Sequence, residues 1–546
     1  MTLAALLVLA AGAIQLVAGA LATGVTLDEP LHAERAASWL EEGWYVPGYL
    51  LADGRPDPGN ALASPHVYGP GFAGLAHLAN AVAGNEALGE ISRSAGAYAV
   101  RHLTSAVLAL LAAAAVAAAV TALTRSRRFG LWAAAGLLAV PEWTGQAFFN
   151  PKDTPAAAGY AFLTAGLVLA LSETEAGPAS GRRRLAIGGL LAAGFLIGAG
   201  TRLPLLLPFV ASLLTYAAIR LGQRRLGGIE RPPDTDVAVA AGAGLGVAAI
   251  AVLYPKVASS PLEFLGETVS GSSDYPWQGV TLTAGQLLSE HPPWWYLPAW
   301  IGAAVPLLLG ALAVLGAVAG ARAILAARGA RWRGPLWARR DLGLVLVLQQ
   351  ALLLPLAAIL AGAVMYSGMR QHLYVLPALA ILAGAGAWHL WGWAARRSPP
   401  GRWRGGVAAL LSLALLVPMA EQALLFPYNY AYVNPVAGIG GVEDRWEADY
   451  WVASAPEALS HVPEEAPLQC LLVPPSVPCK EDQLAPFADR RGTDVDERWR
   501  DAAPATWLIL RRHAGNPPLA GCEDTGDVTR WLRGERITMS YVLRCP

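Results

Sequence analysis

Long apolar runs alternate with short polar connections along the first three quarters of the chain. A helix needs about 20 apolar residues to cross the hydrocarbon core of a bilayer, and runs of that kind are the primary signal for membrane spans. They lie at residues 2–22, 96–123, 130–147, 154–172, 185–200, 203–220, 237–254, 297–320, 342–365, 372–392 and 405–425. The pattern therefore predicts an α-helical polytopic membrane protein with about eleven transmembrane helices in residues 1–425.

Basic residues are distributed unevenly among the connections. Arginines concentrate in alternate connections, at residues 125–128, 182–184, 220–231, 322–340 and 396–404, whereas the others carry mostly single cations. Connections rich in Lys and Arg face the cytoplasm. We therefore expect a cytoplasmic N-terminus, and an outer side of the cell (plasma or inner) membrane that carries residues 23–95, residues 255–296 and the C-terminal tail.

Composition agrees with a membrane protein, since 55% of the residues are hydrophobic and only 15% are charged. The formal net charge is zero, so nothing indicates a nucleic-acid partner. Residues 1–22 could instead be a cleaved signal peptide, but the positively charged start of such a peptide is missing. We therefore favour a retained first span.

Residues 426–546 have a different pattern. Short apolar runs at 468–473, 506–510 and 537–543 predict strands, and the stretches 452–461 and 527–533 predict helices. Together they predict a small extracytoplasmic α/β domain after the membrane domain of residues 1–425.

All four cysteines lie in this tail, at Cys470, Cys479, Cys522 and Cys545. An even number in one exterior segment is typical of disulfides. Three pairings are open, and proximity in the chain favours Cys470–Cys479 with Cys522–Cys545. Free buried thiols are the alternative, whereas the spacing disfavours a zinc site.

Asp28 and Glu29 follow the first apolar run by about six residues. Placing ionised side chains beside a membrane costs free energy unless they are exposed to water, and such side chains commonly have a function. The pair therefore predicts an active site at the outer surface. Asp28 before Glu29-Pro30 also fits a helix N-cap. The segment 28–42 has the apolar spacing of an amphipathic helix that lies along the interface.

Further charged side chains lie at the outer ends of other spans: Lys152 with Asp153, Arg202, and Arg370 with His372. Acids and cations held near headgroup level fit a phosphate-bearing lipid substrate and a hydroxyl acceptor. Lys152 is one of only three lysines in the chain. Two alternatives stay open: Asp153 caps the following span, and the arginines reach out to lipid headgroups.

Three segments resemble a known family: residues 24–30, residues 148–153, and residues 426–435 with 447–451. They are similar to the polyprenol-phosphate-sugar-dependent glycosyltransferases of the GT-C fold in glycosyltransferase family 39, the protein O-mannosyltransferase and aminoarabinose-transferase-like group. The resemblance covers the membrane domain and the start of the tail. It implies transfer of a mannose- or arabinose-like sugar, with inversion, from a polyprenyl-phosphate donor to an extracytoplasmic protein or glycan acceptor.

The resemblance also implies roles for single residues. Polyprenyl phosphate is a good leaving group, so one carboxylate suffices as a base, whereas a glycosidase needs an acid as well. Asp28 is expected to be this base, with Glu29 as the second candidate. Lys152, Arg202 and Arg370 are expected to bind the donor phosphate, Asp153 is the second-loop acid on the acceptor side, and His32, His372 and Tyr68 are further candidates. No cofactor is predicted, although a divalent metal near Glu29 and His32 stays open.

Two other functions remain as alternatives. A transporter or flippase of lipid-linked substrates would have inverted repeats and charges at mid-membrane, and no repeat is visible. A non-catalytic assembly subunit with the same fold would lack Asp28 or the cations, and both are present.

Overall fold

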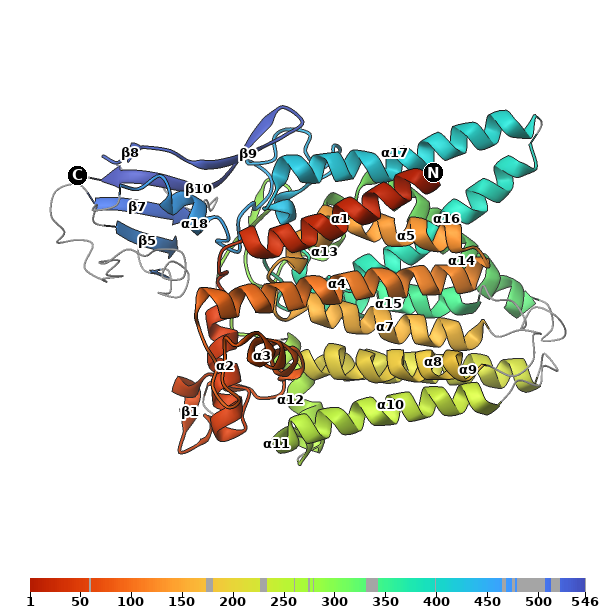
Figure 1. Cartoon of the computed structure of the whole chain (residues 1–546), viewed down its shortest axis with the longest axis horizontal. Helices are drawn as coiled ribbons and strands as arrows, with labels where there is room; N and C mark the ends of the chain where they lie inside the picture. The colour runs from red at the N-terminus through yellow and green to blue at the C-terminus, as the bar shows by residue number, and fades with distance from the viewer. Residues whose placement is uncertain are drawn as a thin grey trace.

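A computed structural model of the chain describes residues 1–57, 60–172, 180–225, 233–259, 261–273, 275–277, 279–329, 342–397, 399–463, 468–473, 477–478, 506–511 and 521–545. Its long helices run side by side as one bundle, and a β-sheet region lies at one end (Figure 1). The C-terminus lies in this sheet region, and the N-terminus lies on the side of the bundle away from it (Figure 1).

Eight helices in the described residues are long and apolar enough to cross a membrane. They are α1 (Thr2–Ala22), α4 (Ala95–Thr124), α7 (Asp153–Leu171), α9 (Leu206–Arg225), α10 (Pro233–Leu253), α15 (Gly343–Ala361), α16 (Val375–Ala395) and α17 (Pro400–Leu425). A ninth span arises if α13 (Tyr296–Ala304) and α14 (Leu307–Gly329), which meet at 116°, are taken together. The predicted polytopic membrane fold is confirmed.

The prediction of eleven spans needs correction, because the two other predicted segments are interrupted helices. Residues 130–147 form α5 (Arg127–Leu138) and α6 (Pro141–Ala147), and Pro141 begins the second helix because proline cannot continue the first. Residues 185–200 form α8 (Gly181–Ala193) followed by a π-helical turn, η3 (Gly194–Ala199). Such π-turns are frequent at functional sites.

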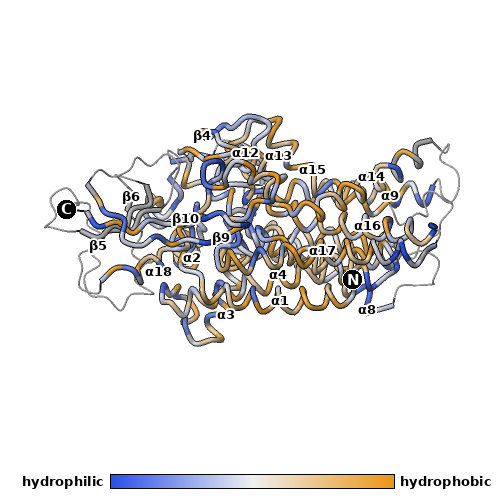
Figure 2. Tube along the Cα trace, turned by 90° about the horizontal axis from the view of Figure 1, so that it is seen from above, coloured by the Kyte–Doolittle hydropathy of each residue, from blue (hydrophilic) through white to orange (hydrophobic). Residues whose placement is uncertain are grey.

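Polarity follows the long axis of the bundle. Apolar residues line the lengths of the helices, and hydrophilic residues gather toward the two ends (Figure 2). The arginine-rich ends of α4, α9 and α16 lie at the end opposite the sheet region (Figure 1). This arrangement agrees with one basic and one less basic side, as the connections predict.

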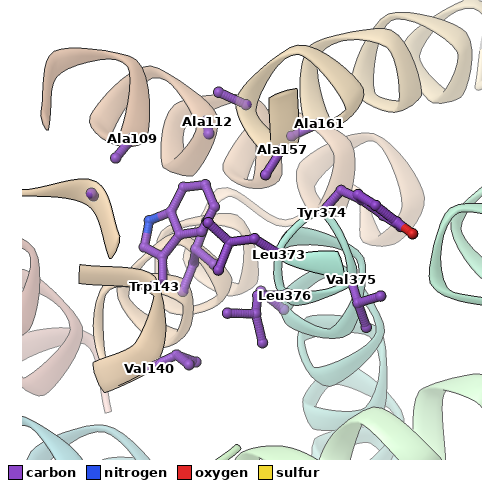
Figure 3. Close-up of a cluster of buried hydrophobic side chains, with 14 of the residues drawn as sticks. Ala109, Ala112, Val140, Trp143, Ala157, Ala161, Leu373, Tyr374, Val375 and Leu376 are labelled. Atoms are coloured by element: carbon purple, nitrogen blue, oxygen red, sulfur yellow. The ribbon is translucent and has the colours of Figure 1, made fainter. Parts of the chain in front are cut away.

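Small residues let the helices approach closely around Trp143 of α6. Figure 3 shows its indole surrounded by Ala109 and Ala112 of α4, Ala157 and Ala161 of α7, and the segment from Leu373 to Leu376 that enters α16. Trp143 is fully buried. This packing fixes α6, and with it the turn from Phe148 to Asp153 that follows.

A glycine contact fixes the position of Arg202. A Cβ placed on Gly159 of α7 would lie 2.3 Å from the Cα of Gly198 in η3, so only glycine permits this approach. The approach brings Arg202, a few residues after Gly198, next to Asp153 at the start of α7.

The described parts of the loops at the sheet end contain short helices and hairpins. They contain the predicted amphipathic helix, α2 (Glu29–Glu42), together with α3 (Gly71–Ala83), α11 (Pro255–Ala258), α12 (Pro261–Ser273), the hairpins β1–β2 (Leu51–Ala52 with Arg55–Pro56) and β3–β4 (Thr281–Thr283 with Gln286–Leu288), and the 3₁₀ turns η1 (Gly48–Leu50), η2 (Ala61–Ala63), η4 (Leu203–Leu205), η6 (Arg370–His372) and η7 (Asn429–Ala431). Helices α2, α3, α11 and α12 cover this end of the bundle (Figure 1).

The tail forms a six-stranded sheet in the order β6-β5-β7-β10-β8, with β9 also paired to β10. The strands are β5 (Leu468–Val473), β6 (Val477–Pro478), β7 (Thr506–Arg511), β8 (Glu523–Asp524), β9 (Val528–Leu532) and β10 (Glu535–Cys545), and a short helix, α18 (Ala455–Leu459), precedes them. The three predicted strands are confirmed as β5, β7 and β10, and α18 lies in the first predicted helical stretch.

The predicted helix over residues 527–533 is wrong, because this stretch is strand β9. Val528 and Leu532 are both buried, and the positive φ angles of Arg533 and Gly534 form the turn of a hairpin with β10. Side chains that alternate across a strand also place positions four residues apart on one face, so this spacing fits a strand as well as a helix.

Cys522 is disulfide-bonded. The side chains of Cys470, Cys479 and Cys545 lie outside the described residues. The pairing of the four cysteines therefore stays a prediction.

Candidate active site

Asp28 lies at the centre of a group of charged side chains from four separate connections. Its Oδ2 atom is 2.6 Å from Nζ of Lys152 and 2.7 Å from Nη1 of Arg370. Asp28 occupies the N-cap position of α2, but its side chain makes no capping hydrogen bond. The capping alternative is therefore wrong, and the carboxylate instead joins the cations of two other loops.

The two cations also control the protonation of Asp28. Burial by itself would raise the pKa of this carboxyl, but the positive charges of Lys152 and Arg370 outweigh burial and hold the pKa well below its usual range. Asp28 is therefore ionised. It is a weak base while it is paired with both Lys152 and Arg370.

Asn150 sets the geometry of the turn that carries Lys152. Its Oδ1 accepts hydrogen bonds from the backbone N–H groups of Lys152 and Asp153, at 3.1 and 2.8 Å. Its Nδ2 donates to Oδ2 of Asp153 at 3.0 Å. Asn150 thus accepts from the first two N–H groups at the start of α7, and Lys152 rather than Asp153 occupies the N-cap position. The capping alternative for Asp153 is therefore also wrong.

Arg202 and Arg370 both face the interior of the protein. Arg202 lies 3.1 Å from Oδ1 of Asp153, and its Nη1 donates to the carbonyl of Gln371. The side chain of Arg370 is only 7% exposed, and its guanidinium carbon lies 4.4 Å from the ring centroid of Trp451. For Arg370, this burial excludes the alternative of an arginine that reaches out to lipid headgroups.

Tyr68 connects the cations. Its ring centroid is 5.2 Å from the guanidinium carbon of Arg35, 5.4 Å from Nζ of Lys152 and 5.8 Å from the guanidinium carbon of Arg202. Burial alone would raise the pKa of Tyr68, but Lys152 and Arg202 more than offset it, so the pKa lies below its ordinary value. The phenol thus stands in a strongly positive environment.

Arg35 is a site residue that the sequence analysis missed. It is buried in α2, and its Nη1 donates to the carbonyl of Tyr45 at 3.2 Å. Asp28, His32 and Arg35 are spaced by four and three residues, which places them on one face of a helix. That spacing was the signal available in the sequence.

The charges of the group do not cancel. Lys152, Arg202, Arg370 and Arg35 supply four positive charges, and two carboxylates, Asp28 and Asp153, supply two negative ones. The remaining two positive charges match a phosphate group that carries up to two negative charges.

A cavity of about 270 Å³ begins at Arg202, the one member of this charged group that lines it, and continues between apolar helices. Tyr68, Arg202 and His372 line its polar part. Leu207 of α9 and Ala361 of α15, which also line it, are exposed on the outside of the bundle. The cavity therefore fits an amphiphile whose charged head lies at Arg202 and Tyr68, beside Lys152, and whose apolar chain leaves toward the membrane.

The two candidate histidines are uncharged. Burial and the nearby Lys152 hold the pKa of His32 well below its usual value, and burial with Arg202 lowers the pKa of His372 to about 3. His32 instead contacts the Tyr45 hydroxyl at 3.1 Å and the edge of the Tyr68 ring. In the described part of the chain no three His, Cys, Asp or Glu side chains are grouped so that they could hold a metal ion. The alternative of a divalent metal near Glu29 and His32 stays open.

Replacing His372 by Gln is expected to make the stability of the protein less sensitive to acid. An unfolded histidine titrates near pH ~6.5, so between that pH and about 3 the unfolded chain binds the extra proton. Stability therefore rises with pH in this window, and it falls on acidification. Thermal unfolding at several pH values should show a shallower acid decline for His372→Gln than for the wild type. The exposed His291, changed to Gln, is the control, and an unchanged slope for His372→Gln would contradict the buried neutral imidazole.

Glu29 lies apart from the cations. Its Oε1 is 2.7 Å from Nε2 of His102, and its Oε2 accepts hydrogen bonds from the backbone and hydroxyl groups of Thr26. The structure thus joins Asp28, Lys152, Arg370, Arg202, Asp153 and Tyr68 in one site, with His372 at the cavity, and places Glu29 in a separate contact behind them.

No family model and no curated protein matches the sequence. Two solved structures are similar to the chain: crystal structures of ArnT from Cupriavidus metallidurans, one bound to undecaprenyl phosphate and one in the apo state. They have 14% and 15% sequence identity and TM-scores of 0.45 and 0.43, and each comparison covers 99% of this chain and 97% of the other. ArnT is an aminoarabinose transferase of the GT-C fold, the group whose motifs the sequence resembles. The function is therefore inferred from the residues of the site.

Proposed function

We propose that this protein is an inverting membrane glycosyltransferase that moves a sugar from a polyprenyl-phosphate donor to a hydroxyl group of an extracytoplasmic protein or glycan. A mannose- or arabinose-like sugar is the proposed cargo. The observation that carries the proposal is the pairing of Asp28 with Lys152 and Arg370 next to a cavity that reaches the lipid-facing side of the bundle.

The donor phosphate would take the place of Asp28 as partner of the cations. Both cations contact one carboxylate oxygen, Oδ2, and among the described residues none bonds to Oδ1. A phosphate oxygen that binds Lys152 and Arg370 weakens their hold on Asp28, and the pKa of the carboxyl then rises toward its usual range. Donor binding would thereby make the Asp28 carboxylate basic enough to accept the proton of the acceptor hydroxyl.

The reaction then follows from the charges. The acceptor hydroxyl gives its proton to Asp28, its oxygen bonds to the anomeric carbon, and the bond from that carbon to the phosphate oxygen breaks. The phosphate leaves with one more negative charge than it had in the donor. Lys152, Arg370 and Arg202 stabilise this developing charge more than the ground state, which is how they would raise the rate.

The decisive experiment supplies the purified protein in lipid nanodiscs with polyprenyl-phosphate mannose or arabinose and with protein or glycan acceptors. Transfer with inversion at the anomeric carbon is the expected result. A parallel assay in liposomes follows movement of the donor across the bilayer. Donor movement without transfer would replace the proposal by the transporter alternative, and binding of the donor without either activity would favour the assembly subunit.

A bulky side chain in the cavity should discriminate between donors by chain length. Ala358 of α15 lines the cavity, so Ala358→Phe is expected to raise KM for a long polyprenyl donor and to affect a short-chain donor much less. Leu360→Phe is the control, because Leu360 is 86% exposed and does not line the cavity. Equal KM changes for both donors would show that the lipid chain lies elsewhere.

A further inference from the structure

Glu29 and His102 form a buried pair beneath Asp28. The distance between Oε1 of Glu29 and Nε2 of His102 is 2.7 Å, and the two side chains are 2% and 1% exposed. His102 belongs to α4, whereas Glu29 is the first residue of α2. The pair therefore connects a long helix of the bundle to the loop that carries the proposed base.

Hydrogen-bond chemistry fixes the protons of this pair. Nδ1 of His102 lies 2.9 Å from the carbonyl oxygen of Ala20, and because a carbonyl only accepts, Nδ1 must carry hydrogen. A neutral imidazole with hydrogen on Nδ1 would then turn the lone pair of Nε2 toward the Glu29 carboxylate. Two acceptors at 2.7 Å repel each other, so a further proton must lie between Nε2 and Oε1.

The other oxygen of Glu29 is occupied as well. Oε2 accepts from the backbone N–H of Thr26 at 2.8 Å and from its hydroxyl at 2.9 Å. With His102 on Oε1, the carboxylate has three hydrogen-bond partners. Among the described residues its only charged partner is His102, whereas Lys152 and Arg370 contact Asp28 instead.

We infer that the Glu29–His102 pair holds one proton, bound to Nε2 of the more basic imidazole and donated to Oε1, and that the pair positions Asp28, so that Glu29 is a positioning residue and not the base. This inference rests on the proposed glycosyl transfer. The imidazole holds the chain on both sides of Asp28, at the carbonyl of Ala20 near the end of α1 and at Glu29.

The same face of α4 also supports the loop of Lys152. Ser105, three residues after His102, directs its hydroxyl to the carbonyl of Asn150, at 3.4 Å. Helix α4 thus supports both the Asp28 segment and the turn of Lys152. A change at the Glu29–His102 pair would therefore shift Asp28 relative to Lys152, while Ser105 still holds the turn of Lys152 in place.

Glu29→Gln separates the two roles, because an amide can replace the carboxylate without moving it. Its amide nitrogen can donate to a neutral His102, and its amide oxygen can accept from Thr26. We expect kcat for Glu29→Gln to stay within about tenfold of the wild type, whereas loss of a general base costs about 10²–10⁴-fold. A loss as large as that of Asp28→Asn would overturn the inference.

Glu29→Ala removes the pair and should reduce kcat by about 10²-fold, since a misplacement of about 1 Å can have that effect. The donor KM should change little, because Lys152 and Arg370 belong to other loops. Wild-type kcat for Glu29→Ala, or a loss confined to KM, would show that the pair does not position Asp28. If Glu29→Gln keeps the activity that Glu29→Ala loses, the side chain at this position acts by holding Asp28 in place, and its negative charge is not required.

A spectroscopic measurement tests the proton of this pair without any activity. In protein labelled with ¹⁵N-histidine, His102 should show hydrogen on both ring nitrogens in the wild type at about pH 8 and on Nδ1 alone in Glu29→Gln. The signal of His102 is assigned by its loss in His102→Asn. A neutral His102 in the wild type would contradict the inference. If instead the wild type transfers no sugar, the proposed function fails while this measurement still decides the state of the pair.

Discussion

Replacing Asp28 by Asn is expected to lower kcat by about 10²–10⁴-fold, the usual contribution of a general base. Asparagine keeps the shape of the side chain, but it cannot take the proton of the acceptor hydroxyl. The loss should appear at saturating concentrations of both substrates, because it concerns the chemical step.

The same substitution is expected to leave donor binding at least as tight as in the wild type. In the free protein Asp28 occupies both Lys152 and Arg370, at 2.6 and 2.7 Å, so the donor phosphate must compete with it. The uncharged amide of the Asp28→Asn variant would compete much less. Direct binding of polyprenyl phosphate, measured by calorimetry, should therefore show an equal or lower Kd beside the loss of turnover.

Asp153→Asn is the matched control, since Asp153 is the second acid of the site but bonds to Arg202 and Asn150. It should alter donor binding through Arg202 and reduce kcat less than Asp28→Asn does. Wild-type turnover of Asp28→Asn would exclude Asp28 as the base. Weaker donor binding in that variant would contradict the competition between Asp28 and phosphate.

Removing a phosphate-binding cation is expected to impair both donor binding and turnover. Lys152→Ala and Arg370→Ala should each lower kcat/KM by about 10²–10³-fold, as loss of one donor to a developing negative charge does elsewhere. Part of the loss should appear as weaker donor binding and part as slower chemistry, because the phosphate gains charge as the sugar leaves. Kinetics at several donor concentrations separates the two parts.

Lys256 offers a matched control for Lys152. It is another of the three lysines, and its ammonium group contacts the carbonyl of Glu42 and the Trp44 ring rather than the site. Lys256→Ala should have wild-type kinetics. Arg370→Lys keeps a positive charge and should recover part of the activity of Arg370→Ala. If Lys152→Ala keeps full activity, the donor phosphate does not bind at Lys152.

The repeating pattern of apolar runs predicts most of the bundle, because a membrane span is encoded locally by length and hydrophobicity. Eight of the eleven predicted segments are uninterrupted helices. Pro141 was visible in the sequence as a break, whereas the π-helical turn before Arg202 was not. That turn coincides with the contact between Gly159 and Gly198, which joins distant parts of the chain.

For the candidate site, too, some features could be predicted from the sequence and others depend on long-range packing. Alternation of spans places the connections of Asp28, Lys152, Arg202 and Arg370 at one end, so the sequence alone could predict which charges gather there. It could not predict that Asp28 binds Arg370, a residue 342 positions later, or that Asn150 accepts from the first two N–H groups at the start of α7. The sequence analysis likewise did not predict that Arg35 belongs to the site or that Glu29 lies apart from the cations.

The order of residues is thus enough to predict a polytopic helical protein with a small sheet region after the bundle and a set of charged residues at one end. Which carboxylate faces the cations, and which one faces His102, depends on the packing of the folded chain. Hydrophobic length and polarity act over one segment at a time. The partners of a charge depend instead on how closely helices from distant parts of the chain can pack.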